Sequence, residues 1–148
     1  MSQPRIVLIV DDEEICLTIT SQMVEKIGLR AITAHDGIEA LEAYQQYGHE
    51  IGCVLMDIQM PRMNGIEAFR RLKDISENVR VVIASGYLTN ANQELLEPLE
   101  PVGYLNKPIN FSVLSGMLSK CLRTDGQPGR EGETADLLDA APERQEEG

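Results

Sequence analysis

The stretch Cys53–Gly65, CVLMDIQMPRMNG, places an acid directly after a run of apolar residues. The apolar residues Cys53 to Met56 precede Asp57, and Gly65 follows eight positions after the acid. A continuous apolar run of this kind is typical of a strand that is buried on both faces of a parallel sheet. Asp57 therefore ends a buried strand, where an acid needs a structural or functional reason.

Similar strand-forming runs lie elsewhere in the chain. Continuous apolar, β-branched runs occupy residues 5–10 and 79–85, and weaker strand candidates lie at 30–34 and 102–106. Together with the run at 51–56 they make five predicted strands, spread along the chain with room for a helix after each.

Helical spacing of apolar residues appears between these strands. A poorer helical segment lies at about 90–97, where Pro98 would stop it. Five alternations of strand and helix predict an α/β fold, a doubly wound five-stranded parallel sheet in three layers. The apolar positions that define the other helices are Ile15, Ile19, Met23 and Ile27; Ile38, Leu41 and Tyr44; Ile66, Phe69 and Leu72; and Phe111, Leu114, Leu118 and Cys121.

Length and charge exclude several classes of protein. The chain has 148 residues, 43% of them hydrophobic, and a net charge of −11, which argues against nucleic-acid binding by bulk electrostatics. The first apolar stretch ends in four acids, unlike a signal peptide, and no apolar run approaches the roughly 18–20 residues that cross a membrane. We therefore expect a cytoplasmic protein that binds neither nucleic acid nor membrane.

The cysteines and histidines give no sign of a metal or disulfide framework. Cys16, Cys53 and Cys121 are far apart and odd in number, so we expect buried, reduced thiols. His35 and His49 stand apart in the sequence and are expected on the surface or in loops.

The composition changes after residue 123. Residues 124–148 hold eight acids and two bases and are rich in Gly and Pro, which predicts a disordered acidic tail after a folded domain at 1–123. Such a tail is too short and too polar to form an output domain. A solvated end is the favoured interpretation, and an electrostatic gate over a partner-binding face is the alternative.

Polar residues follow four of the predicted strands. Asp11 and Asp12 follow the first strand, Asp57 the third, Ser85 the fourth and Lys107 the fifth. Because functional residues of parallel α/β sheets gather at the carboxyl ends of the strands, we expect these side chains to converge. Each motif alone could be a helix start or a turn, but their joint occurrence favours a site.

The chemistry of this cluster points to phosphoryl transfer. Two carboxylates about 4 Å apart repel by roughly 4 kcal/mol at an effective dielectric near 20, and Mg²⁺, which prefers oxygen ligands, would relieve this repulsion. A lysine beside the metal stabilises charge on a phosphoryl group. A carboxylate can accept that group as an acyl phosphate.

Four motifs resemble those of the receiver domain of two-component response regulators. They are VDDEE at 10–14, LMDIQMPRMNG at 55–65, ASGY at 84–87 and YLNKPI at 104–109, and the resemblance runs from residue 5 to about 123. It implies a flavodoxin-like (βα)₅ sandwich with strand order 2-1-3-4-5.

The resemblance also implies roles for the clustered residues. Asp57 would be the phosphoacceptor, converted to 4-aspartylphosphate. Asp11 and Asp12 would hold Mg²⁺ together with Asp57 and the backbone carbonyl of Gln59. Lys107 would pair with the phosphoryl group.

The resemblance also implies which residues respond to phosphorylation. Ser85 would move toward the phosphoryl group and Tyr104 would rotate inward, which would change the face formed by the fourth helix, fifth strand and last helix. The Lys107–Pro108 peptide bond is usually cis in the family. The positions of Gln59 and Tyr87 tune loss of the phosphoryl group, and a large Tyr87 predicts slow self-dephosphorylation.

The implied function is a single-domain response regulator in a phosphorelay rather than an enzyme. Its phosphodonor would be a histidine kinase or a histidine phosphotransfer protein, which would dock on the apolar edge of residues 13–20, and its output would be contact with a downstream protein. The family often has a glycine and an alanine just before the fifth strand, where this chain has Glu100 and Pro101.

Three other interpretations fit parts of this pattern. A haloacid-dehalogenase-like phosphatase needs a second aspartate where this chain has Gln59, and a flavodoxin relative needs a phosphate cradle where this chain has the acids of residues 11–14. A receiver-like scaffold that works without phosphorylation stays open, and phosphate incorporation would distinguish it.

Overall fold

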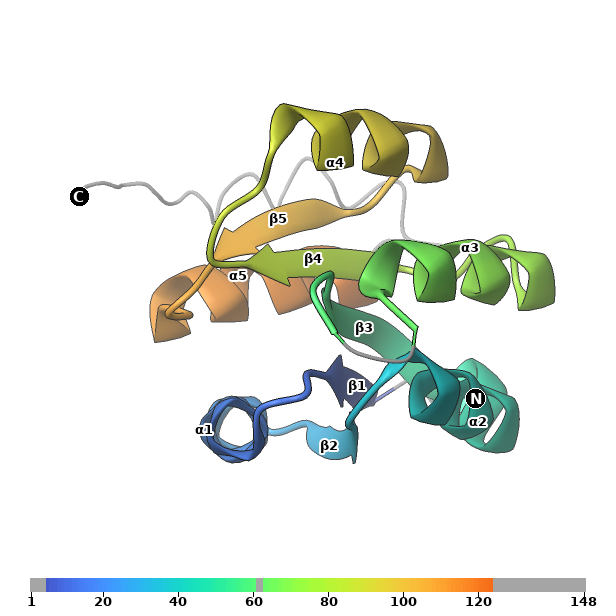
Figure 1. The fold of residues 1–148 in the computed structure, drawn as a ribbon. Coiled ribbons are helices and arrows are strands. Elements are labelled where there is room, and N and C mark those ends of the chain that lie inside the picture. The colour runs from blue at the N-terminus through green and yellow to red at the C-terminus, as the bar shows by residue number, and fades with distance from the viewer. Residues whose placement is uncertain (1–4, 61–62, 124–148) are drawn as a thin grey trace.

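The computed structural model describes residues 5–60 and 63–123. Its five parallel strands form one sheet in the order β2-β1-β3-β4-β5, so the predicted doubly wound, flavodoxin-like fold is confirmed (Figure 1). The strands are β1 (Ile6–Val10), β2 (Arg30–Ala34), β3 (Ile51–Asp57), β4 (Val81–Ser85) and β5 (Gly103–Asn106). The helices are α1 (Glu14–Ile27), α2 (Gly37–Tyr47), α3 (Gly65–Ile75), α4 (Asn90–Leu96) and α5 (Phe111–Arg123), with 3₁₀ turns η1 (Gly48–Glu50) and η2 (Glu97–Leu99).

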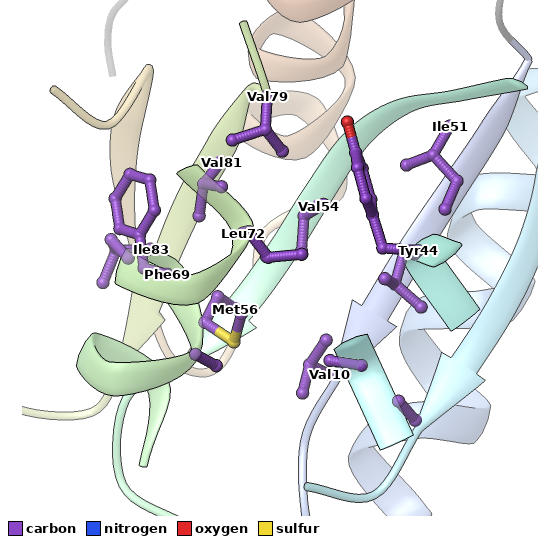
Figure 2. Packing of buried hydrophobic residues seen from close by; sticks show 14 of the residues in the cluster. Val10, Tyr44, Ile51, Val54, Met56, Phe69, Leu72, Val79, Val81 and Ile83 are labelled. Atoms are coloured by element: carbon purple, nitrogen blue, oxygen red, sulfur yellow. The ribbon is translucent and has the colours of Figure 1, made fainter. Parts of the chain in front are cut away.

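Helices cover both faces of the sheet. One apolar cluster joins the sheet to α2, α3 and α4, and Figure 2 shows Val54 and Met56 of β3 in this cluster with Tyr44, Phe69 and Leu72. A second cluster joins the other face to α1 and α5. Every residue of β1 and β4 is buried, as expected for strands covered on both sides.

Side-chain caps fix where three helices begin. The side chains of Asp36, Asn64 and Thr89 accept hydrogen bonds from the backbone N–H groups three residues on, which starts α2, α3 and α4. The predicted helix at 90–97 ends at Leu96, and Pro98 lies in the following 3₁₀ turn rather than ending the helix outright. Predicted strand ends differ from the observed ones by at most two residues.

Only part of the apolar stripe predicted for the first helix packs on the core, where Met23 and Ile27 lie partly buried. Ile15 is 73% exposed and Ile19 is 48% exposed, whereas Leu17 and Val24 of the same helix are buried against the sheet. The helix was predicted correctly, but the predicted stripe includes two exposed residues, because α1 carries apolar residues on two sides. The exposed isoleucines therefore form an apolar surface on α1.

The cysteines match their prediction in part. Cys53 and Cys121 are buried and are not disulfide-bonded, but Cys16 is partly exposed at the start of α1. Within residues 5–60 and 63–123, no helix is long and apolar enough to span a membrane. The acidic tail, residues 124–148, lies outside the described residues, so the division of the chain at residue 123 stays a prediction.

Candidate functional site

Three carboxylates meet at the carboxyl ends of the strands. Asp11 and Asp12 follow β1, and Asp57 is the last residue of β3. Asp11, Asp12 and Asp57 each offer a carboxylate oxygen, and these oxygens lie within 4.8 Å of one another. Asp11 and Asp57 are buried while Asp12 is exposed, so the cluster opens to solvent on one side.

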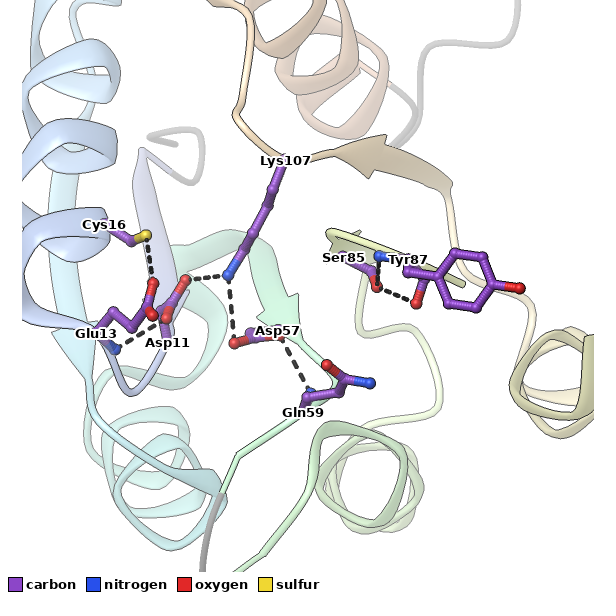
Figure 3. A network of polar contacts seen from close by, with 8 residues as sticks. All are labelled: Asp11, Glu13, Cys16, Asp57, Gln59, Ser85, Tyr87 and Lys107. Carbon is purple, nitrogen blue, oxygen red and sulfur yellow. Dashed lines mark hydrogen bonds and ion pairs between the residues drawn. The ribbon is translucent and has the colours of Figure 1, made fainter. Parts of the chain in front are cut away.

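Local backbone hydrogen bonds orient the two buried acids. Oδ1 of Asp11 accepts the Glu13 N–H at 2.9 Å, and Oδ1 of Asp57 accepts the Gln59 N–H at 3.1 Å (Figure 3). Each bond links an acid to the loop that follows its own strand. The Oδ2 atoms of both acids are therefore turned toward the fifth predicted site residue, Lys107.

Lys107 bridges the two buried acids. Its Nζ lies 2.6 Å from Asp11 Oδ2 and 3.3 Å from Asp57 Oδ2. The Lys107 N–H donates to the Ser85 carbonyl at 3.0 Å, and the Lys107–Pro108 peptide bond is cis. Burial opposes the charged ammonium, but the hydrogen bond to Asp11 and the charges of both acids outweigh it and raise the pKa of Lys107.

The surroundings of Asp57 disfavour the charged form of its carboxyl group. Burial raises the pKa of the Asp57 carboxyl, and the negative charge of Asp11 adds to this effect. The Gln59 N–H and Lys107 oppose the shift without cancelling it. One ammonium therefore does not fully compensate the acids, and a divalent cation with oxygen preference fits the remaining negative charge.

Gly65 allows the chain to return close behind Asp57. Its N–H donates to the Ile58 carbonyl at 3.1 Å. A Cβ added at Gly65 would lie 2.3 Å from the Asp57 carbonyl oxygen and 2.7 Å from the Ile58 Cα. Only glycine fits this approach without moving the backbone that carries Asp57.

Ser85, the last residue of β4, is hydrogen-bonded to the loop that follows its own strand. The Ser85 hydroxyl donates to the Tyr87 carbonyl at 2.9 Å and accepts the Tyr87 N–H at 3.1 Å. The Tyr87 ring is 74% exposed and points away from Asp57 in Figure 3. Tyr104 on β5 is 36% exposed, and the side chain of Gln59 is also exposed.

Two further residues adjoin the site that sequence reasoning did not single out. Oxygens of Asp11 and Glu13 and the Cys16 sulfur lie within 4.8 Å of one another. The Cys16 thiol donates to Glu13 Oε1 at 3.1 Å, and this hydrogen bond is the main cause that raises the pKa of Cys16 to about 11. Glu13 and Cys16 are three positions apart at the start of a predicted helix, and this spacing was the sequence signal for their contact.

A second polar contact joins the starts of α1 and α2. The His35 ring lies between Glu14, with Nε2–Oε1 at 2.8 Å, and Glu39, with Nδ1–Oε1 at 3.0 Å. His35 is exposed, as expected, and its ring contacts two acidic side chains. The four-residue spacing of His35 and Glu39 was visible in the sequence, whereas the contact with Glu14 depends on the fold.

The fold and the acidic cluster define a class of signalling domain. Residues 7–119 match the response regulator receiver domain, and the chain belongs to this family of two-component signalling proteins.

Relatives include both short and long proteins. The chain is 31% identical over 121 residues to the autoinducer 1 sensor kinase/phosphatase LuxN of Vibrio campbellii, a match covering 82% of this chain but only 14% of LuxN. It is 29% identical over 109 residues to the polar-differentiation response regulator DivK of Brucella anthropi, covering 72% of this chain and 87% of DivK.

Solved structures share the fold. A response regulator receiver domain protein from Clostridium thermocellum superposes with a TM-score of 0.75 at 26% identity, covering 80% of this chain and 94% of that one. A CheX–CheY–BeF3–Mg complex from Borrelia burgdorferi contains a chain that superposes with a TM-score of 0.74 at 27% identity, covering 79% and 88%.

Proposed function

We propose that this receiver domain accepts a phosphoryl group on Asp57, with Mg²⁺, from a histidine kinase or a histidine phosphotransfer protein. The observation that carries the proposal is the meeting of Asp11, Asp12 and Asp57 within 4.8 Å, with Lys107 bound to two of them. Asp57 is our proposed acceptor because the motif around it, residues 55–65, resembles that of receiver domains, and Lys107 lies 3.3 Å from its carboxylate.

The donor set fits a hard divalent cation. Asp11, Asp12 and Asp57 would hold Mg²⁺ through carboxylate oxygens, and the backbone carbonyl of Gln59 would add another oxygen. Bound Mg²⁺ would neutralise charge on the transferring phosphoryl group. The BeF3 and Mg in the Borrelia burgdorferi complex support this assignment by similarity.

The chain's own groups would complete the reaction and the response. Lys107 would stay within reach of Asp57 and pair with a phosphoryl oxygen. Ser85 would exchange its hydrogen bonds with the Tyr87 backbone for one to the phosphoryl group, and the half-exposed Tyr104 would turn inward. These movements would alter the surface formed by α4, β5 and α5, the proposed contact with a downstream protein.

The exposed apolar surface of α1 suits docking of the phosphodonor. Ile15 and Ile19 lie on the first two turns of the helix that follows Asp11 and Asp12. A helix of a donor protein packed there would bring its phosphohistidine close to Asp57. The chain would act in the cytoplasm through protein contacts rather than through nucleic acid or membrane.

The lifetime of the phosphorylated state would depend on Gln59 and Tyr87. In the structure the Tyr87 ring is turned to solvent, so shielding of the acyl phosphate would require the ring to fold back over Asp57. Slow self-dephosphorylation stays our prediction. A lifetime of seconds for the phosphorylated protein would contradict it.

The test is incubation of the chain with a small phosphodonor and Mg²⁺, followed by intact mass measurement. We expect a gain of one phosphoryl group that requires Mg²⁺ and is absent in Asp57→Ala. Asp74→Ala, which removes an exposed acid of α3, should still gain the group. No gain in the parent protein would favour a receiver-like scaffold that acts without phosphorylation.

A further inference from the structure

Two buried cysteines meet between the central strand and the last helix. Cys121 of α5 donates its thiol hydrogen to Cys53 of β3 across an Sγ–Sγ distance of 3.0 Å, although 68 positions separate the residues. Each is 1% exposed. Because a disulfide bond is about 2.05 Å long, the two sulfurs need to approach by only about 1 Å to become bonded.

The packing around the pair holds the sulfurs together. Both cysteines belong to the apolar cluster between the sheet and α1 and α5, where Leu55, Leu114 and Leu118 also lie. Cys53 precedes Asp57 by four positions on the same strand. A bond here would therefore connect the strand that ends in the proposed acceptor to a helix of the proposed output surface.

We propose that Cys53 and Cys121 form a redox-sensitive site, which a small-molecule disulfide such as oxidised glutathione converts into an intramolecular disulfide between β3 and α5. This site is independent of Asp57 chemistry. It adds a covalent, reversible modification to a fold that the proposed function controls by phosphorylation.

The reaction balances in two exchanges. In the first, the Cys121 sulfur attacks the small disulfide, forms a mixed disulfide and releases one small thiol. In the second, the Cys53 sulfur attacks the Cys121 sulfur of that mixed disulfide and releases the second small thiol. Two protein thiols are oxidised to one disulfide, and one molecule of the small disulfide is reduced to two thiols, which carry the protons.

Access determines the order of these exchanges. Cys121 lies two residues before the end of α5, and helix ends open locally far more often than central strands do. Cys53 lies inside the central strand, and burial raises the pKa of its thiol well above the ordinary value, so it is a poor first nucleophile. The pair should therefore stay reduced until the end of α5 opens, and oxidation should be slow but specific.

The test uses the full chain without phosphodonor. The protein is incubated with oxidised glutathione, free thiols are trapped by alkylation in denaturant, and the products are measured by intact mass and tryptic mapping. The three cysteines fall in separate tryptic peptides, 6–26, 31–62 and 121–123, so a crosslink can be assigned. We expect a mass loss of two hydrogen atoms, a crosslink of peptides 31–62 and 121–123, and reversal by dithiothreitol.

Variants separate the two steps. Cys16→Ser should form the same crosslink, because Cys16 is partly exposed at the start of α1 and outside the pair. Cys53→Ala should stop at a mixed disulfide on Cys121, seen as the gain of one glutathione. Circular dichroism of the variants checks that they fold, and the crosslink map of the parent protein decides the question even if they do not.

Three results would overturn the proposal. The first is retention of both buried thiols while Cys16 alone reacts. The second is a crosslink that includes Cys16 or joins two chains. The third is a Cys121 mixed disulfide in the parent protein that never closes onto Cys53. None of these bears on Asp57, so failure here is distinct from failure of phosphorylation.

Discussion

Lys107 lies closer to Asp11 than to Asp57, with its Nζ 2.6 Å from Asp11 Oδ2 and 3.3 Å from Asp57 Oδ2. Its strongest contact is therefore with a proposed metal ligand and not with the proposed phosphoacceptor. A divalent cation bound by Asp11 would compete with this ion pair. Binding of the cation would release Lys107 toward Asp57, where the phosphoryl group would arrive.

This competition predicts that removal of the ammonium strengthens Mg²⁺ binding. We expect Lys107→Ala to bind Mg²⁺ about tenfold more tightly, equivalent to about 1.4 kcal/mol, because three carboxylates are left with no cation among them. Isothermal titration calorimetry measures the affinity. Lys120→Ala, at an exposed position of α5, is the matched control and should bind Mg²⁺ as the parent does. Unchanged or weaker binding by Lys107→Ala would refute the competition.

The burial of Asp57 predicts a stability change that depends on pH. Its folded pKa is raised, so its contribution to the free energy of unfolding is fully present below the unfolded pKa of about 3.9 and is lost as pH rises through the folded pKa. With chelator present, Asp57→Asn should melt a few degrees above the parent at pH 7. The substitution removes a carboxylate charge that burial disfavours, while the ion pair between Lys107 and Asp11 remains.

Melting curves from about pH 4 to pH 8 check this linkage, since the unfolded reference pKa is about 3.9. The difference between Asp57→Asn and the parent should shrink toward acid pH, where Asp57 is protonated in both states. Added Mg²⁺ should stabilise the parent more than the variant. A parent that melts higher than Asp57→Asn at pH 7 in chelator would show that burial does not dominate at this carboxyl.

The sequence predicted the sheet and the site for one physical reason. Strands buried on both faces are continuous apolar runs, so the polar residue after each run marks the end of the strand. Parallel topology then brings Asp11, Asp57 and Lys107 to one edge without any knowledge of side-chain packing.

What the sequence could not predict depends on contacts between distant segments. The apolar spacing of α1 fits either of two faces, and only docking on the sheet selects Leu17 over Ile15 as the buried residue. The approach of Cys121 to Cys53 depends on how α5 lies across β3, which no local pattern encodes.

Two glycines predict opposite responses to the same substitution. Gly65→Ala should destabilise the fold by about 1–3 kcal/mol, the usual cost of overpacking, because its Cβ would meet the backbone of Asp57 and Ile58. Gly116→Ala should stabilise by about 0.5–1 kcal/mol, because Gly116 is an exposed interior position of α5 with nothing within 4 Å of a new Cβ. Urea unfolding of both variants measures the pair.

The site offers a second readout for the glycine pair. Gly65→Ala should also slow Asp57 phosphorylation by a small phosphodonor, because the clash displaces the acceptor backbone, while Gly116→Ala should leave that rate unchanged. A Gly65→Ala variant as stable as the parent would show that the close approach at Gly65 is not a constraint on the folded protein.

The apolar surface of α1 predicts a difference between two kinds of phosphodonor. Ile15 is 73% exposed, so Ile15→Asn should leave the melting temperature nearly unchanged. It should slow phosphotransfer from a histidine phosphotransfer domain about tenfold, if one buried apolar contact is worth about 1.5 kcal/mol, and leave transfer from a small phosphodonor unchanged. Quenched time courses with each radiolabelled donor measure both rates.

A matched control lies on another helix. Ile75 on α3 is 44% exposed, and Ile75→Asn should alter neither rate. Equal slowing by both substitutions would mean that an exposed asparagine slows phosphotransfer whichever helix carries it. Unchanged transfer from the protein donor to Ile15→Asn would place the docking surface elsewhere on the chain.

His35 predicts a pH-dependent link between the starts of α1 and α2. The hydrogen bond to Glu14, followed by that to Glu39, raises the folded pKa of His35 above its unfolded value of about 6.5. The stabilisation is therefore fully present below about pH 6.5 and is lost as pH rises through the folded pKa. His35→Asn should melt below the parent at about pH 6, and the two should converge by about pH 9, where the imidazole is neutral in both states.

The exposure of His35 limits the size of this effect. Its side chain is 50% exposed, so water and salt screen the ion pairs, and the difference in melting temperature at pH 6 should decrease between about 0.05 M and 1 M NaCl. His49→Asn is the control, because it makes the same substitution at an exposed position in η1. A difference that grew with pH would contradict the assigned direction of the shift, since protonation of His35 would then oppose its contacts with Glu14 and Glu39.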